Sequence, residues 1–188
     1  DLNNLDVVTT TSDEYADSFG FTEDEVFSVF DDVGLGSEKG NVKYLYDGFT
    51  FGKYTDIYNP WSITSFIKKG GKYSAYWANT SSNGLVNSLI QTGKAELKEI
   101  IRVLIEGGSF KAMIDEQIVF DQLGYSANAV WSLLLATGYL KVLEVEAVGE
   151  YKEECYTLAL TNKEVSMMFR NMVNSWFKNN SYIPYNDF

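Results

Sequence analysis

The chain has 188 residues, of which 45% are hydrophobic and 15% aromatic, so it is long and apolar enough to bury a core. Its formal net charge of −11 opposes binding to nucleic acid unless basic residues cluster locally. The absence of histidine excludes histidine-based nucleophiles and metal ligands, and the single cysteine, Cys155, excludes an intrachain disulfide and favours a reducing, cytoplasmic setting.

The first predicted elements are a strand-like run at 6–11 and a helix at 22–32. The run is rich in β-branched residues and has no strand nearby to pair with. It is therefore either a disordered or edge segment, or a strand belonging to a sheet in another domain. Thr22 and Glu25 have the spacing of a capping box at the start of the helix. The residues expected to face inward are Val26, Phe27, Val29 and Phe30.

A second helix is predicted at 38–46, followed by short extended pieces at 49–52 and 55–58. Pro60 is suited to the first turn of the next helix, because proline is tolerated there. Gly70 and Gly71 would end this helix. Its expected inward residues are Trp61, Ile63, Phe66 and Ile67.

Two further helices are predicted at 82–91 and 95–106. The second carries an apolar stripe with the spacing of one helix face, which predicts that this face is buried. The stripe consists of Leu97, Ile100, Ile101, Leu104 and Ile105.

The C-terminal half has the element order of a winged-helix module. A strand is predicted at 110–114 and a short helix at 115–121, then a helix that Ser126 caps and Gly138 ends. Two strands at 139–148 and 155–160 enclose a polar turn, and Thr161 with Glu164 predicts a capping box that opens a helix to Lys178. The predicted fold class is α+β and predominantly α-helical, with a two-stranded wing in this half.

The face that reads DNA in many winged helices is poorly equipped here. The helix at 126–137 has no arginine, lysine or glutamine, although base readout needs long donors and phosphate anchoring needs positive charge. The wing is mainly acidic, with Glu144, Glu146, Glu150, Glu153 and Glu154 against Lys141 and Lys152. These features predict a packing or protein-contact role, with direct DNA binding disfavoured.

Several short patterns resemble catalytic motifs without meeting their requirements. The glycine-rich stretch 34–40 lacks the Gly-Lys-Ser/Thr ending and the preceding strand of a phosphate-binding loop. The Glu-x-Lys patterns at 96–98 and 150–152 fall on a helix and in a turn, away from the acid-bearing strands that a nuclease metal site uses. No catalytic or metal-ligating residue is therefore predicted. The tryptophans are expected to anchor cores, and they are Trp61, Trp77, Trp131 and Trp176.

Stretches spread along the chain match the pattern of one bacterial family: Asp1–Leu5, Tyr15 with Phe19–Thr22, Tyr46–Gly52, Ile57–Ser62, Tyr76–Asn83, Ile114–Gln117, Leu133–Leu140 and Leu160–Val165. They resemble the AAA-ATPase-like proteins that carry a C-terminal PD-(D/E)XK-type nuclease domain. The resemblance covers essentially the whole chain in the same order. One departure is Leu45, where the family often has tryptophan.

The resemblance implies that the chain is the middle of such a protein. The family's Walker A and Walker B segments would lie before Asp1, and the nuclease domain would begin around or after Tyr185. The expected division is a remnant strand of the ATPase domain at 1–12, a helical lid-like domain at 13–93, a winged-helix domain at 94–178 and a linker at 179–188.

The resemblance also implies a nucleotide-facing site. Related ATPases often present a proline at a helix start to the nucleotide, and Asn59-Pro60-Trp61 resembles that arrangement. ATP and Mg would be bound by the parent's ATPase domain, with no cofactor in this chain. The alternative is that Pro60 is a plain first-turn residue and Trp61 lies in the core.

The expected function is therefore non-catalytic. The lid would close over nucleotide, and the winged helix would relay that state to the nuclease domain or to a protein partner. Two alternatives remain open. One is a nucleic-acid-binding module that docks DNA through Lys94, Lys98 and Arg102. The other is a protein-interaction module that assembles the ATPase into homo-oligomers.

Overall fold

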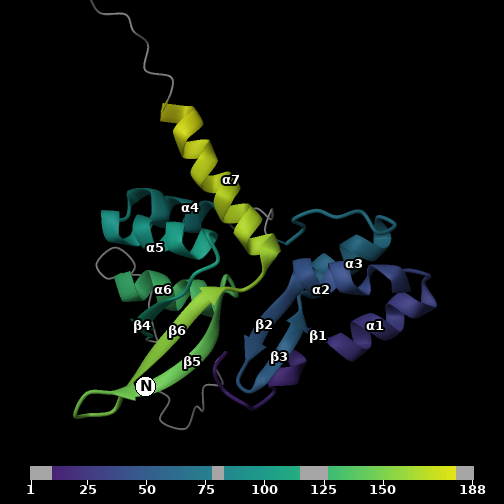
Figure 1. Cartoon of the computed structure of the whole chain (residues 1–188), viewed down its shortest axis with the longest axis horizontal. Coiled ribbons are helices and arrows are strands. Elements are labelled where there is room, and N and C mark those ends of the chain that lie inside the picture. The colour runs from purple at the N-terminus through teal and green to yellow at the C-terminus, as the bar shows by residue number, and fades with distance from the viewer. Residues whose placement is uncertain (1–9, 78–82, 115–126, 181–188) are drawn as a thin grey trace, which may run out of the picture.

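The computed structural model describes residues 10–77, 83–114 and 127–180, which form two groups of elements that lie side by side (Figure 1). The first group contains a three-stranded antiparallel sheet in the order β1-β3-β2. Its elements are η1 Ala16–Ser18, β1 Phe21–Thr22, α1 Glu23–Asp32, η2 Gly36–Glu38, α2 Lys39–Tyr46, β2 Asp47–Phe51, β3 Tyr54–Tyr58 and α3 Pro60–Lys68.

The second group contains another three-stranded antiparallel sheet, in the order β4-β6-β5. The hairpin of β5 and β6 forms its long arm, and α7 begins between the two groups and extends away from them (Figure 1). The elements of the second group are α4 Asn83–Thr92, α5 Ala95–Ile105, β4 Phe110–Met113, α6 Ala127–Ala136, β5 Leu140–Val148, β6 Glu153–Leu160 and α7 Lys163–Asn180.

Each group has its own apolar core. In the first group, Phe30 on α1 stacks on Phe66 on α3, with ring centroids 5.7 Å apart, and Tyr46 on α2 meets the same ring edge-on. The second core joins α4, α5, α6 and α7 to the β4-β6-β5 sheet. Val86 and Ile90 on α4 belong to this second core, so α4 packs with the elements that follow it in the chain.

The predicted mixture of helices and antiparallel strands is confirmed, and most element positions agree with the sequence analysis to within a few residues. The strand run before residue 10, the helix at 115–121, the Ser126 cap and the segment after 180 lie outside the described residues. None of the helices in the described ranges combines the length and apolarity that crossing a membrane requires.

The ends of two helices follow the predicted local chemistry. Thr22 and Glu25 form the capping box of α1, with each side chain bonded to the other residue's backbone N–H. Gly138 ends α6 with a φ of 82°, and the N–H groups of Gly138 and Tyr139 donate to the carbonyls of Leu135 and Leu134. This pair of bonds is the Schellman arrangement, which satisfies carbonyls at a helix C-terminus.

Three predicted placements are wrong. Val29 and Trp61 were expected to face inward, but their exposed fractions are 43% and 58%. On both helices the buried face is narrower than the run of apolar residues. Val26 and Phe30 fill the buried face of α1. Ile63 and Phe66 fill that of α3. The third is the predicted capping box at Thr161, because Asn162 caps α7 by accepting from the Val165 N–H.

Candidate functional site

The predicted nucleotide-facing residues Asn59, Pro60 and Trp61 lie together at the start of α3. The Asn59 side-chain oxygen accepts from the backbone N–H groups of Trp61 at 2.9 Å and Ser62 at 3.3 Å. Pro60 has no N–H, so the amides in this first turn are already satisfied within the chain. What α3 presents to a ligand is therefore the exposed Trp61 ring beside Pro60.

A buried carboxylate joins the two groups of elements. Glu164, in the first turn of α7, has an exposed fraction of 1%. One of its oxygens accepts from the Ser62 hydroxyl at 2.8 Å, and the other accepts from the Trp77 backbone N–H at 2.7 Å. A buried carboxylate is costly unless it is hydrogen-bonded, so these donors hold α3, the segment after it and α7 in one arrangement.

Two neighbours of Glu164 reinforce this junction. The Asn162 side-chain amide donates to the Tyr46 carbonyl at 3.0 Å, while its oxygen caps α7. The Thr161 hydroxyl donates to the Gly138 carbonyl at 2.6 Å. Gly48, with a φ of 128°, lies so close to the Thr161 carbonyl that a Cβ would approach its oxygen to 2.1 Å. Glycine at 48 is therefore what lets β2 approach the end of β6.

An acidic cluster lies in the first group of elements. One oxygen each from Glu23 on α1, Asp47 on β2 and Asp56 on β3 lie within 4.8 Å of one another. The Lys43 ammonium contacts Glu23 at 2.5 Å and Asp56 at 3.3 Å, and the Tyr58 hydroxyl donates to Glu23 at 3.1 Å. Carboxylate oxygens suit hard cations, but here Lys43 already supplies positive charge to Glu23 and Asp56.

The environment of this cluster separates the proton affinities of two of its acids. Burial, and then the hydrogen bond with Asp56, raises the pKa of Asp47 to about 6. Hydrogen bonds from Thr55 and then Asp47 lower the pKa of Asp56. The environment therefore favours the protonated form of Asp47 more than that of Asp56. The sequence pattern does not reveal this cluster, because its members come from three separate elements.

Helix α6, which the sequence analysis predicts as the reading helix of a winged helix, is largely buried. Trp131 is 2% exposed and Leu134 is fully buried, and Ala129, Val130 and Leu135 are buried as well. Among the side chains of α6 whose burial is described, Asn128 and Ala136 are exposed, and the hydroxyl of the following Thr137 donates to the Leu133 carbonyl at 2.6 Å. This helix therefore serves the core, as its apolar sequence predicts.

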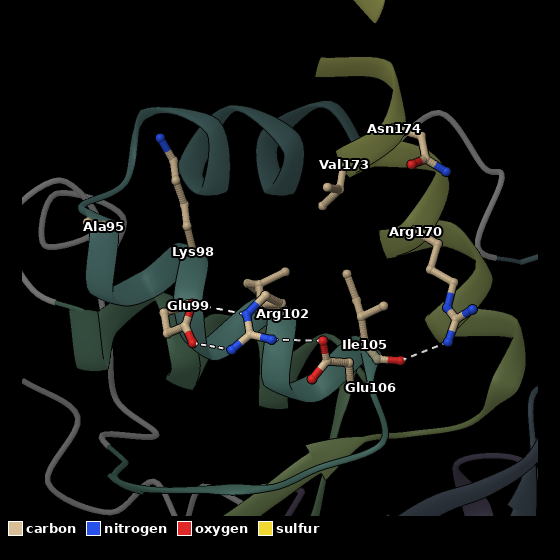
Figure 2. A pocket seen from close by; sticks show the side chains of 10 residues that line it. Ala95, Lys98, Glu99, Arg102, Ile105, Glu106, Arg170, Val173 and Asn174 are labelled. Atoms are coloured by element: carbon tan, nitrogen blue, oxygen red, sulfur yellow. Dashed lines mark hydrogen bonds and ion pairs between the residues drawn. The ribbon is translucent and has the colours of Figure 1, made fainter. Parts of the chain in front are cut away.

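Two of the residues proposed for DNA docking, Lys98 and Arg102, line a groove between α5 and α7, and the third, Lys94, is the N-cap residue of α5 (Figure 2). Arg102 is held between Glu99 at 2.5 Å and Glu106 at 2.8 Å, so its charge is already compensated. The groove has a volume of about 730 Å³, and Ile101, Ile105 and Val173 form its apolar wall. Figure 2 shows the Arg170 side chain at one end, where it donates to the Ile105 carbonyl at 3.1 Å.

No protein-family model, curated protein or solved structure matches this chain. Membership of the AAA-ATPase-like family therefore stays a prediction.

Proposed function

We propose that this chain is the non-catalytic lid and winged-helix region of an AAA-type ATPase, and that it couples nucleotide state to a downstream nuclease domain or a protein partner. The ATP and Mg would be bound by a Walker-type domain elsewhere in a longer chain. The observation that carries the proposal is the buried Glu164 carboxylate, which bonds α7 to Ser62 on α3. Through this contact, a displacement of α3 would be passed to α7.

The winged-helix assignment is supported by the order and pairing of the C-terminal elements. Helix α5 precedes β4, α6 precedes the β5–β6 hairpin, and β6 pairs between β4 and β5. A long hairpin at the edge of a small sheet is the arrangement that the term wing describes. The buried α6 and the acidic hairpin favour a packing use of this module over DNA reading.

The lid assignment draws support from the exposed start of α3. An aromatic ring that is 58% exposed beside a proline offers a flat apolar surface to a nucleotide base. Since Asn59 already satisfies the nearby amides, Trp61 and Pro60 would contribute more to nucleotide contact than the helix N-terminus. The phosphates would be held by the Walker-type domain.

Isothermal titration of the 188-residue chain with Mg·ATP tests this proposal. We expect no micromolar binding and no hydrolysis, because the 188 residues contain no phosphate-binding loop pattern. Micromolar binding with turnover would show that this chain has an ATPase site of its own and would refute the proposal.

A protein-interaction role is the second candidate, and the α5–α7 groove is the observation that favours it. In its apolar wall, Ile105 and Val173 are partly buried and lie among charged residues of both helices, as the apolar centres of interfaces often do (Figure 2). Light scattering on the chain across a range of concentrations tests self-association. A concentration-dependent mass that falls on substitution of Val173 by Asp would favour this candidate.

A further inference from the structure

A second pocket lies where the two groups of elements meet. Its volume is about 400 Å³, and its lining comes from α2, the start of β2, the end of α5, β5, β6 and the first turns of α7. Pockets of this size accommodate small ligands. Its wall is rich in polar groups, in contrast to the α5–α7 groove on the other side of Arg170.

Three cationic side chains from two different elements line this pocket. Lys141 belongs to β5, whereas Lys163 and Arg170 lie on one face of α7 together with Ser166. Within the described parts of the chain, none of the three forms an ion pair with an acidic side chain. The basic residues that do are Lys39, Lys43, Lys53, Arg102 and Lys111.

Each cation is placed by a local contact that leaves N–H donors available. Arg170 uses one nitrogen to bond the Ile105 carbonyl, and its guanidinium has further donors. Lys163 lies over the Tyr44 ring, with its ammonium 5.6 Å from the ring centroid. The Lys141 ammonium lies beside Gly48, where a Cβ would come within 3.2 Å of it. The absence of a side chain at 48 gives Lys141 room there.

The acidic groups in the lining cancel only part of these charges. Glu106 is paired with Arg102 at 2.8 Å. Asp47 is half-buried, and burial and then Asp56 raise its pKa to about 6, so at pH 7 it is mainly ionised and offsets part of the positive charge. In a chain whose net charge is −11, three cations therefore line one concave site.

We infer that this pocket binds a phosphate group of a small ligand, held by Lys141, Lys163 and Arg170. Lysine supplies a point charge and arginine a fork of donors, a combination suited to phosphate. Lys163 is also the first residue of α7, where the helix dipole disfavours a cation. A bound anion would remove that conflict. The inference goes beyond the proposed function and does not depend on it.

Calorimetric and thermal-unfolding titrations of the chain with inorganic pyrophosphate test the site. We expect sub-millimolar binding and a rise in Tm that exceeds the effect of NaCl at the same ionic strength. Lys141→Gln and Lys163→Gln should each weaken binding by about tenfold, because each removes one charge-assisted contact. Lys163→Gln should leave the ligand-free Tm unchanged or raised, a sign opposite to that of damage to the fold.

Matched variants and probes make the result decisive. Lys163→Arg should retain binding, and Lys68→Gln, an exposed lysine on α3, should bind like the natural chain. Equal loss in Lys68→Gln, or a Tm response no larger than that to NaCl, would overturn the site. Citrate that binds as tightly as pyrophosphate would overturn the phosphate assignment. If titration with Mg·ATP releases binding heat in the natural chain and none in Lys163→Gln, the ATP binds at this pocket. That result would support the phosphate site and would not involve the lid site at Trp61.

Discussion

Residues with similar sequence patterns can lie in very different environments in this protein. The tryptophans have similar apolar helical settings, yet Trp131 is 2% exposed and Trp61 is 58% exposed. Trp77 is partly buried between the rings of Phe49 and Tyr139. Hydrophobicity alone does not decide which side of a short helix is covered, because that depends on the neighbours that pack against it.

The contrast between Trp61 and Trp131 predicts opposite results for the same substitution. Trp131→Ala should lower the free energy of unfolding by about 3–5 kcal/mol, because it leaves a cavity in the second core. Trp61→Ala should change it by no more than about 0.5 kcal/mol. Urea denaturation of both variants measures the difference. A loss of several kcal/mol for Trp61→Ala would mean that its ring is packed in solution.

Asp47 predicts a pH dependence of stability. Its pKa is raised to about 6 in the folded chain, above that of an unfolded aspartate, mainly by burial and then by Asp56. The folded state therefore binds this proton more tightly, so the contribution of Asp47 to stability falls as pH rises from about 4 to about 6. Lys43 and the other acids of the cluster, Glu23 and Asp56, face the same carboxyl.

Asp47→Asn removes that titration. At pH 7 the natural chain must hold an ionised Asp47 in a half-buried place, and the variant does not. The unfolding free energy of the variant minus that of the natural chain should therefore be larger at pH 7 than at pH 4.5. Denaturant titrations at the two pH values measure this difference. Asp24→Asn, an exposed position on α1, is the control. The same relative free energy at both pH values would contradict the raised pKa.

At the scale of elements, helix ends are well predicted by local sequence when nothing distant competes. The α1 capping box forms because Thr22 and Glu25 need only each other. At α7 the same spacing fails, because Ser62 and the Trp77 N–H bind Glu164 instead. Asn162 then caps the helix. A carboxylate with two buried donors from distant segments is held more firmly than one in an exposed local turn.

Glu164→Ala should lower the free energy of unfolding by about 2–5 kcal/mol, because it leaves buried donors of Ser62 and Trp77 without their acceptor. Glu144→Ala, at an exposed position of β5, is the matched control and should change stability by less than about 0.5 kcal/mol. Urea denaturation of both variants measures the difference. Equal values for the two variants would exclude a structural role for the junction.

Gly138 is the second element-scale test. An alanine there would adopt a φ of 82° and bring its Cβ to 2.8 Å from the Phe49 ring. We expect a loss of about 1 kcal/mol or more for Gly138→Ala. Gly40→Ala, on α2 with open space around it, should instead gain about 0.5 kcal/mol. Thermal unfolding of the two variants should therefore shift Tm in opposite directions.

At the scale of the whole molecule, the acidic net charge and the buried α6 oppose association with DNA. Fluorescence anisotropy with a labelled duplex at low salt should show no binding tighter than about 0.1 mM. Lys98→Gln with Arg102→Gln should leave this result unchanged, because Arg102 is already paired with Glu99 and Glu106. Tighter binding with a salt slope of several units, lost in that double variant, would instead support the nucleic-acid alternative.

The sequence by itself determined the local features of this protein. Helix and strand positions, the α1 cap and the Gly138 stop follow from periodicity and from the geometry of individual residues. The absence of histidine and of a phosphate-binding loop restricts the chemistry without any reference to the fold. These properties depend on neighbours a few positions apart, which is the range over which sequence patterns carry information.

Only the tertiary structure decided which distant residues meet. It brought Glu164 to Ser62, grouped Asp47 with Glu23 and Asp56, and gathered Lys141 with Lys163 and Arg170 around one pocket. It also left Trp61 exposed, although its sequence setting resembles that of a core residue. The physical reason is that burial, pKa and charge balance depend on all the atoms packed around a group, and most of those come from remote parts of the chain.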